Sequence, residues 1–210
     1  MEIEGFNFET VSPSEIETLS MATIEKELPH PINERLAPII KRVIHTTADF
    51  DYVDQLTFSE EVVSHALNVI RNGCHIVTDT NMAKAGINKS ALAKYGGRVS
   101  CFMADEDVAA EAKRRGVTRA VVSMEKAAGI EEPLVFAIGN APTALIRLYE
   151  LIKEKRIKPE LIIGVPVGFV NVVEAKELIM QADVPYIVAR GRKGGSNVAA
   201  AIVNSLLYYK

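Results

Sequence analysis

Hydrophobic residues from position 74 onward fall into short uninterrupted runs that alternate with segments of helical periodicity. This pattern predicts strands joined by helical crossovers, and therefore a mostly parallel sheet covered on both faces. We expect an α/β fold, a three-layer, doubly wound sandwich that forms a single domain over residues 1–210. The predicted strands are Cys74–Thr78, Arg98–Phe102, Arg119–Met124, Leu134–Ile138, Leu161–Val165 and Tyr186–Ala189, and the predicted helices between them are Asp105–Arg115, Ala141–Lys155, Val172–Ala182 and Asn197–Tyr208.

The first 73 residues predict three further helices from their start and stop signals. In the first helix, Ile16, Ile24 and Leu28 form an apolar ridge with Ser20 between them. The three helices run from the capping box Ser12-Pro13-Ser14-Glu15 to about Lys26, from about Leu36 to Thr46, and from a second capping box, Thr57-Phe58-Ser59-Glu60, to Asn72-Gly73.

Three of the predicted strands end in glycine-containing loops that lead into helices, over residues 139–143, 166–171 and 190–197. Glycine allows a ligand to approach the backbone closely, and the N-terminus of a helix presents unpaired N–H groups with a partial positive charge. Three such loops at one sheet edge predict a surface that holds an anionic ligand in several places. The last loop adds Arg192 and Lys193, although a mobile polar loop is an equal alternative for it.

Composition and charge narrow the classes of function. The net charge of −3 gives no basic face for a nucleic acid. Cys74 and Cys101 lie in separate predicted strands without metal-ligand spacing, which indicates buried thiols in a reducing cytoplasm. No stretch has the length of a membrane span, and the N-terminus has no secretory pattern, so we expect a cytoplasmic protein with no membrane partner.

Of the four histidines, His45 is placed like a catalyst because it ends an amphipathic helix. A helix C-terminus favours the protonated imidazole, typically by about 0.3–1 kcal/mol, and the hydroxyls and carboxylates of residues 46–51 can fix its tautomer. Arg42 shares a helix face with it and supplies a fixed cation. The alternatives are a histidine that caps its own helix and a solvated arginine. We interpret the other three histidines as structural: His30, His65 and His75.

No standard catalytic motif is present: there is no GxSxG, HExxH, GxxxxGK[ST] or GxGxxG pattern. Four segments are distinctive instead: Ile44-His45-Thr46, Gly139 to Leu145, Gly164 to Val170, and Gly191 to Ser196. Together they resemble the precorrin-8X methylmutase family of corrin biosynthesis. The resemblance runs from about Ser20 to Asn204, with the segments in the same order and at similar spacing.

The resemblance implies an isomerase of cobalamin biosynthesis that moves a methyl group from C-11 to C-12 of precorrin-8X, or of its cobalt form. The product would be hydrogenobyrinic acid or cobyrinic acid. The resemblance implies no external cofactor and no protein-bound metal, since any cobalt belongs to the tetrapyrrole substrate. It also implies a homodimer with the site near the subunit interface. The final helix, apolar around much of its circumference, suits such an interface, although burial in the core explains it equally well.

The resemblance assigns His45 as the residue that supplies a proton to the tetrapyrrole. Arg119, expected at a strand start far from the glycine loops, serves a neighbouring subunit's site or is structural. Asn88 stands where some relatives have threonine. The residues that the resemblance and the loops together assign to substrate binding are Ser20, Arg42, Asn88, Arg119, Asn140, Gly168, Arg192, Gly194, Gly195 and Ser196.

Two other functions are compatible with the residues alone. One is a non-catalytic carrier that holds a tetrapyrrole without converting it. The other is a phosphate- or nucleotide-binding enzyme that uses Gly191 to Ser196 as an anion loop, for which the sequence offers neither a GxGxxG turn nor a magnesium site.

Overall fold

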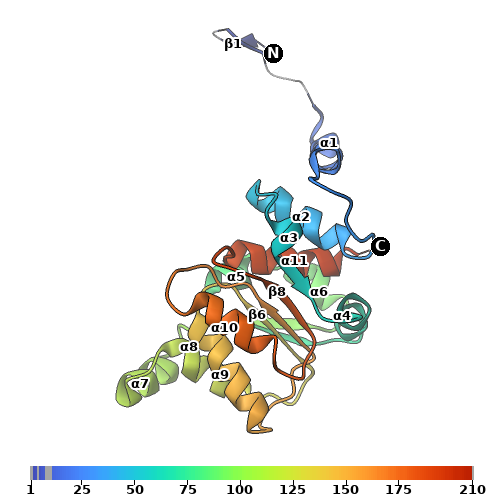
Figure 1. The fold of residues 1–210 in the computed structure, drawn as a ribbon. Helices are drawn as coiled ribbons and strands as arrows, with labels where there is room; N and C mark the ends of the chain where they lie inside the picture. Colours follow the sequence, from blue (N-terminus) through green and yellow to red (C-terminus); the bar gives the residue numbers. More distant parts are fainter. Residues whose placement is uncertain (1, 4, 8–10, 210) are drawn as a thin grey trace.

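The computed structural model describes residues 2–3, 5–7 and 11–209. At its centre is a six-stranded sheet (Figure 1). Its strands are β3 (Leu56–Phe58), β4 (His75–Thr78), β5 (Arg98–Ser100), β6 (Leu134–Ile138), β7 (Leu161–Gly164) and β8 (Tyr186–Ala189). They lie in the order β3-β8-β7-β6-β4-β5, and every neighbouring pair is parallel except β3 with β8. The predicted α/β fold with a mostly parallel sheet is therefore confirmed.

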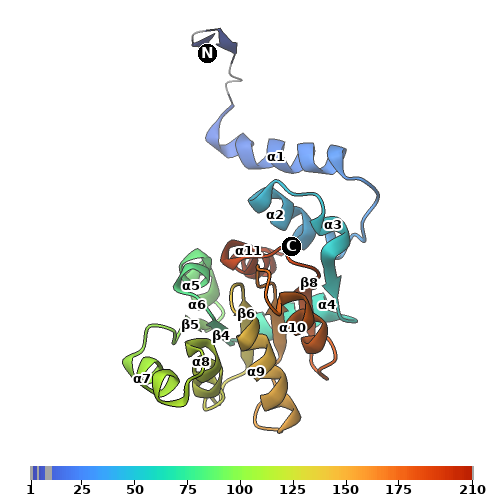
Figure 2. The ribbon, with the colours of Figure 1, turned by 60° about the vertical axis from the view of Figure 1, so that its left-hand side comes forward.

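Helices cover both faces of the sheet. The helices are α1 (Pro13–Glu27), α2 (Ala37–Thr47), α3 (Tyr52–Gln55), α4 (Val62–Arg71), α5 (Asn81–Gly86), α6 (Lys89–Ala93), α7 (Glu106–Arg115), α8 (Arg119–Ala127), α9 (Pro142–Lys153), α10 (Val172–Ile179) and α11 (Ser196–Leu207). Figure 2 shows α8, α9 and α10 on one side of the sheet and α11 on the other, with α7 against α8. A short hairpin of β1 (Glu2–Ile3) and β2 (Phe6–Asn7) precedes α1. No helix in the described part of the chain is long and apolar enough to cross a membrane.

Strand β6 illustrates why the apolar runs are continuous. Val135 and Ala137 pack into the core on the side of α2, α4 and α11, whereas Phe136 and Ile138 pack against α9. All five residues of the strand are buried, as a sheet with two covered faces requires. Helix α11 is buried for the same reason, since it packs against α2, α4, α5 and the sheet within one chain.

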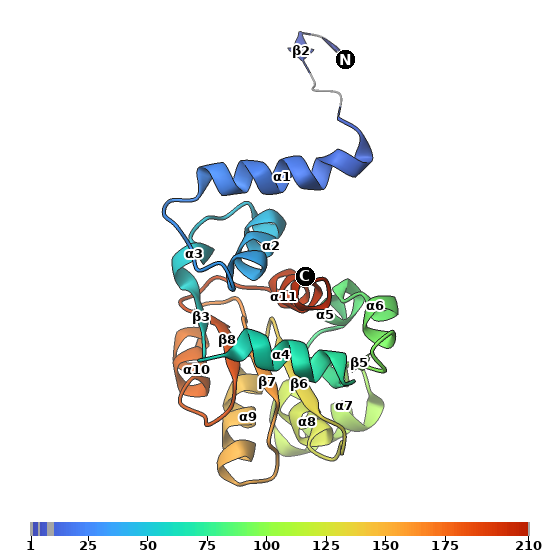
Figure 3. The same ribbon diagram turned by 90° about the vertical axis from the view of Figure 1, so that its right-hand side faces the viewer.

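Helix α1 lies outside these layers, against α2 (Figures 1 and 3). Its capping box between Ser12 and Glu15 forms as predicted. The predicted apolar ridge is covered only at its C-terminal end, where Ile24 is buried. Ile16 and Leu19 are 53% and 46% exposed, so the N-terminal half of α1 presents apolar side chains that the described residues of the chain leave uncovered.

The strand predicted at Arg119–Met124 is wrong, because these residues begin helix α8. The Thr118 side chain caps the helix by accepting a hydrogen bond from the Val121 N–H. Ala120, Met124 and Ala127 are buried at helical spacing, which determines the structure of this short apolar run.

The second predicted capping box is also wrong. Thr57 and Phe58 belong to the edge strand β3, which pairs with β8. The Ser59 hydroxyl accepts a hydrogen bond from the Tyr186 N–H instead of capping a helix. Helix α4 therefore begins only at Val62, after Glu61 in a left-handed conformation.

The chain reverses its direction of travel across the sheet between β4 and β6. From β4 it moves outward to β5, and from β6 it moves the other way through β7 to β8. In doubly wound folds, ligands bind beyond the carboxyl ends of the strands at such a switch point. The loops after β4, β6, β7 and β8 all begin at this edge of the sheet.

Candidate active site

The three glycine loops meet directly, with backbone packed on backbone. A Cβ atom on Gly139 would lie 2.7 Å from the carbonyl oxygen of Gly195, and one on Gly194 would lie 2.1 Å from that of Val165. The Gly195 N–H donates to the Val165 carbonyl at 2.9 Å, and the Gly168 N–H donates to the Arg192 carbonyl at 3.1 Å. At these positions glycine is required for loop-to-loop packing.

The first loop does not offer its N–H groups to a ligand, contrary to the prediction. The carboxylate of Asp79, which directly follows β4, accepts hydrogen bonds from the N–H groups of Gly139, Asn140 and Ala141 at 2.9, 2.8 and 2.6 Å. Asp79 is fully buried. Burial raises the pKa of Asp79, and the three N–H donors oppose that rise. The side chain of Asn140 is exposed and remains available to a substrate.

The residue after Asp79 holds the third loop. The hydroxyl oxygens of Thr80 and Ser196 lie 2.7 Å apart, at the start of α11. Because Thr80 also caps α5 through the Ala83 N–H, one side chain connects two helix N-termini. The end of β4 therefore supports both Asn140 and Ser196, two of the predicted binding residues.

In the third loop, Lys193 is not the free cation that the sequence predicted. Its Nζ lies 2.6 Å from carboxylate oxygens of both Asp49 and Asp51. These hydrogen bonds raise the pKa of Lys193, and that from Lys193 is the main cause that lowers the pKa of Asp49. Arg192 is exposed and its guanidinium lies 5.6 Å from the centre of the Phe169 ring, so it keeps its charge for a ligand.

A buried lysine forms hydrogen bonds to the backbone of the same loop. Lys176, on α10, is fully buried, and its Nζ donates to the carbonyl oxygens of Gly191 and Lys193 at 2.8 Å each. Burial lowers the pKa of Lys176 to about 8.

His45 lies in the last turn of α2 and is exposed. The expected fixing of its tautomer by neighbouring groups is wrong. The Thr46 and Thr47 hydroxyls donate to the helix carbonyls of Arg42 and Val43, and Asp49 and Asp51 pair with Lys193. Among the residues that the structure describes, the His45 ring has no hydrogen-bond partner. The bridge from Lys193 to the 49–51 turn brings the end of the His45 helix to the third loop.

Arg42 lies at a cavity of about 730 Å³ between α1, α2, α5 and α11. Its guanidinium forms an ion pair with Glu17 of α1. The pKa of Glu17 is lowered first by the hydrogen bond from Arg42, then by the charge of Arg42, and to a smaller degree by His45. The cavity is lined by Glu17, Arg42, Thr46, Gly86, Asn197, Ala200, Ala201, Asn204 and Tyr208.

Ser20 and Asn88, two of the predicted binding residues, use their side chains for contacts within the chain. The Ser20 hydroxyl donates to the Ile16 carbonyl of its own helix at 2.8 Å. Asn88 caps α6 and donates to the Tyr208 hydroxyl at the rim of the cavity.

Arg119 lies on the side of the glycine loops, because the neighbouring Thr118 hydroxyl is 2.9 Å from that of Thr143 at the start of α9. The expectation that Arg119 lies at the opposite end of a strand is therefore wrong. In the described part of the chain its guanidinium has no ion-pair partner.

The remaining histidines and the cysteines have local surroundings that fit a structural role. His30 contacts the Pro31 carbonyl and the Asp54 carboxylate, and these two hydrogen bonds raise the pKa of His30. His65 and His75 bond to the Glu160 carbonyl and the Ser100 hydroxyl. Both cysteines are buried free thiols, as predicted. In the described residues, no group of three or more His, Cys, Asp or Glu side chains could hold a metal ion.

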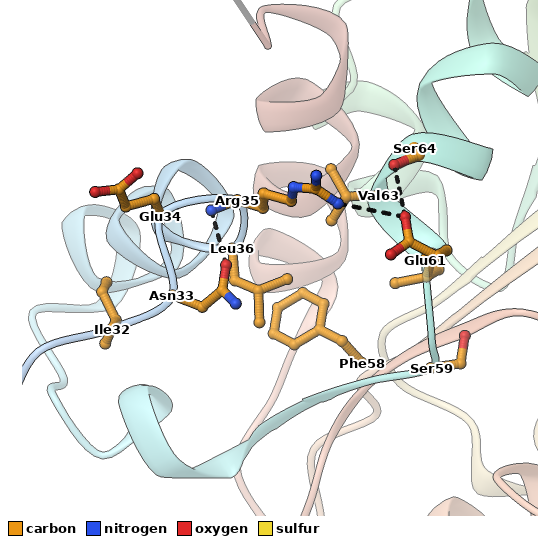
Figure 4. Close-up of a pocket in the computed structure, with 11 residues that line it drawn as sticks. Ile32, Asn33, Glu34, Arg35, Leu36, Phe58, Ser59, Glu61, Val63 and Ser64 are labelled. Atoms are coloured by element: carbon orange, nitrogen blue, oxygen red, sulfur yellow. Dashed lines mark hydrogen bonds and ion pairs between the residues drawn. The ribbon is translucent and has the colours of Figure 1, made fainter.

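A second cavity, of about 650 Å³, lies beside the edge strand β3 (Figure 4). The Arg35 and Glu61 side chains point toward each other there, 3.4 Å apart. Phe58, at the end of β3, and Leu36, directly before α2, also line this cavity. The residues that line this cavity include none of those predicted to act on a substrate.

The sequence prediction missed Asp79, Thr80 and Lys176. The run Thr78-Asp79-Thr80 directly after a buried strand was the available signal for the first two, because polar residues at that edge of a parallel sheet are placed for a site. Lys176 carried no local signal, since a lysine within a surface helix is ordinarily solvated.

The family model for precorrin-8X methylmutase matches residues 15–209 of the chain. The chain belongs to the precorrin-8X methylmutase family. It is therefore a methylmutase, an isomerase of cobalamin biosynthesis, and family membership does not favour the carrier or the nucleotide-binding alternative.

Named methylmutases align with most of the chain. The cobalt-precorrin-8 methylmutase of Priestia megaterium is 44% identical over 198 residues, covering 94% of this chain and 88% of the relative. That of Salmonella typhimurium is 48% identical over 172 residues, covering 81% and 80%. The precorrin-8X methylmutase of Pseudomonas aeruginosa is 40% identical over 173 residues, covering 81% and 83%. A crystal structure of the Thermus thermophilus precorrin-8X methylmutase has a TM-score of 0.84 at 37% identity, covering 92% of this chain and 96% of that one.

Proposed function

We propose that this methylmutase moves the methyl group from C-11 to C-12 of a precorrin-8 macrocycle, with His45 as the group that supplies a proton to the ring. The observation that carries the proposal is the exposed His45 imidazole, which ends α2 with no partner among the described residues and is thus available to a substrate. Protonation of the macrocycle polarises its π-system. An enzyme raises the reaction rate when it stabilises charge that develops in the transition state.

We infer that the substrate is the cobalt form, cobalt-precorrin-8. Support comes from the relatives in Priestia megaterium and Salmonella typhimurium, both cobalt-precorrin-8 methylmutases at 44% and 48% identity. Cobalt is then part of the substrate and needs no protein ligand.

We infer that the carboxylate side chains of the substrate meet Arg192 and Arg119, because neither guanidinium is paired with a carboxylate in the described residues. Arg42 is already paired with Glu17, so it binds a substrate carboxylate only if its guanidinium contacts both carboxylates. The first glycine loop then supplies shape more than charge, since Asp79 takes up the N–H groups of Gly139, Asn140 and Ala141.

We further infer a cytoplasmic homodimer. The exposed Ile16 and Leu19 give α1 an uncovered apolar side, and the cavity beneath α1 is open. Light scattering after size-exclusion chromatography tests the dimer, and Leu19→Lys is the variant expected to weaken it. A monomer at micromolar concentration in the wild type would contradict the inference.

The decisive experiment follows absorption spectra of the protein mixed with cobalt-precorrin-8, because the methyl shift changes the chromophore. Loss of a positioned proton donor slows a reaction roughly 10²- to 10⁴-fold, so we expect His45→Ala to bind the substrate without converting it at a comparable rate. His30→Asn, which removes an exposed histidine paired with Asp54, is the matched control and should convert normally. Binding without conversion by the wild type would support the carrier; normal conversion by His45→Ala would remove His45 from the mechanism.

A further inference from the structure

Lys176 is an unusual residue because its charge is buried without a counter-ion. Its side chain is fully buried, and it makes no ion pair with a carboxylate among the described residues. Taking an ammonium group out of water is costly, and an apolar side chain of similar size would fill the space without that cost. Stability alone therefore does not explain a lysine at this position.

The two contacts of Lys176 determine how the third loop presents its backbone. The carbonyls of Gly191 and Lys193 point inward to Nζ, and the carbonyl between them, that of Arg192, accepts the Gly168 N–H. In a trans peptide the C=O and the N–H point in opposite directions, and the described chain has no cis peptide bond. The N–H groups of Arg192 and Gly194 therefore point away from Lys176, and that of Lys193 points away from the 166–168 turn.

These three N–H groups have no hydrogen-bond partner in the part of the chain that the structure describes. The N–H groups of Arg192 and Gly194 share the side of the loop that faces away from Lys176, and N–H groups gathered on one side of a loop form an anion-binding surface. The other charges at the loop are mostly paired, because Lys193 bonds to Asp49 and Asp51, and Arg190 to Glu177. The charges of Lys176 and Arg192 remain unpaired beside these N–H groups.

We propose that Lys176 is a positioning residue of the methylmutase, which holds the third loop so that the outward N–H groups of Arg192 and Gly194, backed by the lysine charge, bind one carboxylate side chain of the substrate. The proposal rests on the proposed function, in which this loop meets a polycarboxylate macrocycle. Lys176 does not touch the substrate itself and acts through the 191–194 backbone.

Steady-state kinetics with cobalt-precorrin-8 separate this role from a structural one. We expect Lys176→Met to raise KM about tenfold or more, as loss of charge-assisted binding does, with kcat changed less than about threefold because His45 is untouched. Lys176→Gln keeps two N–H donors without the charge and should fall between Met and the wild type. Lys153→Met, which removes an exposed lysine from α9, is the control and should match the wild type.

A wild-type KM in a folded Lys176→Met variant would overturn the proposal while leaving the proposed function intact. Absence of turnover in the wild type would instead remove the proposed function. If neither variant folds, titration of ¹⁵N-labelled wild type with hydrogenobyrinic acid, the metal-free product, decides. We expect the amide signals of residues 192–194 to shift on binding, and unchanged signals at saturation would equally overturn the proposal.

Discussion

The Lys193 ammonium lies 2.6 Å from the Asp49 carboxylate, joining two positions that are 144 residues apart in the chain. Asp49 follows the helix that ends in His45, and Lys193 belongs to the last glycine loop. The ion pair therefore sets the distance between the proposed proton donor and the loop that we expect to hold a substrate carboxylate.

Breaking this bridge should slow catalysis. In Lys193→Met, Asp49 and Asp51 lose their shared cation and repel each other, which displaces the end of α2. We expect kcat to fall roughly tenfold, because small misplacements of a catalytic group are costly. Steady-state kinetics measure the loss, and Asp49→Asn in a double-mutant cycle should show a non-additive effect.

The matched control for that variant is Lys126→Met. Lys126 also bridges two carboxylates, those of Asp105 and Asp107, but on α7 and α8. Its kcat should equal that of the wild type. An equal loss in both variants would mean that the effect is one of general stability.

Asp79→Asn should destabilise the fold strongly. The amide offers one acceptor oxygen where the carboxylate has two, and its NH₂ group faces N–H groups of the first loop. Buried donors left without an acceptor cost about 1–3 kcal/mol each, so we expect a loss of about 2 kcal/mol or more in the free energy of unfolding. Urea denaturation measures it. The exposed Asp183→Asn should change less than about 0.5 kcal/mol, and equal midpoints for the two variants would contradict the prediction.

Gly194→Ala should disrupt the loop junction. The added Cβ would lie 2.1 Å from the Val165 carbonyl oxygen, and Gly194 has a φ of +156°. Since the obstacle is backbone, we expect a loss of about 3 kcal/mol or an insoluble protein. Gly129→Ala is the control, because its nearest contact would be 3.6 Å away and its φ is not positive. Thermal unfolding of the two variants side by side tests the difference.

The burial of Lys176 should make the free energy of unfolding depend on pH. Its pKa falls from 10.5 in the unfolded chain to about 8 in the fold. Between these values the unfolded chain binds the proton and the folded chain does not, so the stability of the wild type rises with pH in this window. Below pH 8 both states are protonated and the slope disappears.

The measurement compares urea midpoints at pH 7.5 and 9.5 in the wild type and in Lys176→Met. Other groups titrate in both proteins, so the difference between them isolates the lysine. We expect the wild type to gain stability relative to the variant at the higher pH. A constant difference would show that Lys176 keeps its ordinary proton affinity in the fold.

Most of the sheet could be predicted because a parallel strand covered on both faces is a continuous apolar run, as at Leu134–Ile138. The run after Thr118 was interpreted as a strand, but the Thr118 cap and packing against α7 and α9 at helical spacing make it a helix. Edge strand β3 was missed because its three residues depend on pairing with β8 rather than on their own pattern.

The candidate site was predictable only in outline. The order of the glycine loops indicated that they meet at one edge of the sheet. The partners of their polar groups did not follow from local sequence, since Asp79 bonds to residues 60–62 positions away and Lys176 to carbonyl groups that carry no side-chain signature. The tautomer prediction for His45 failed because Thr46, Thr47 and Asp49 have nearer partners.

The buried Asp79 carboxylate has a consequence for the choice of ligand. It occupies the place beyond β4 and β6 where other proteins of this architecture hold a phosphate, and it takes up the N–H groups that a phosphate would need. A group of the protein itself thus fills this part of the crevice, and a nucleotide phosphate would find the N–H groups of Gly139, Asn140 and Ala141 already bonded.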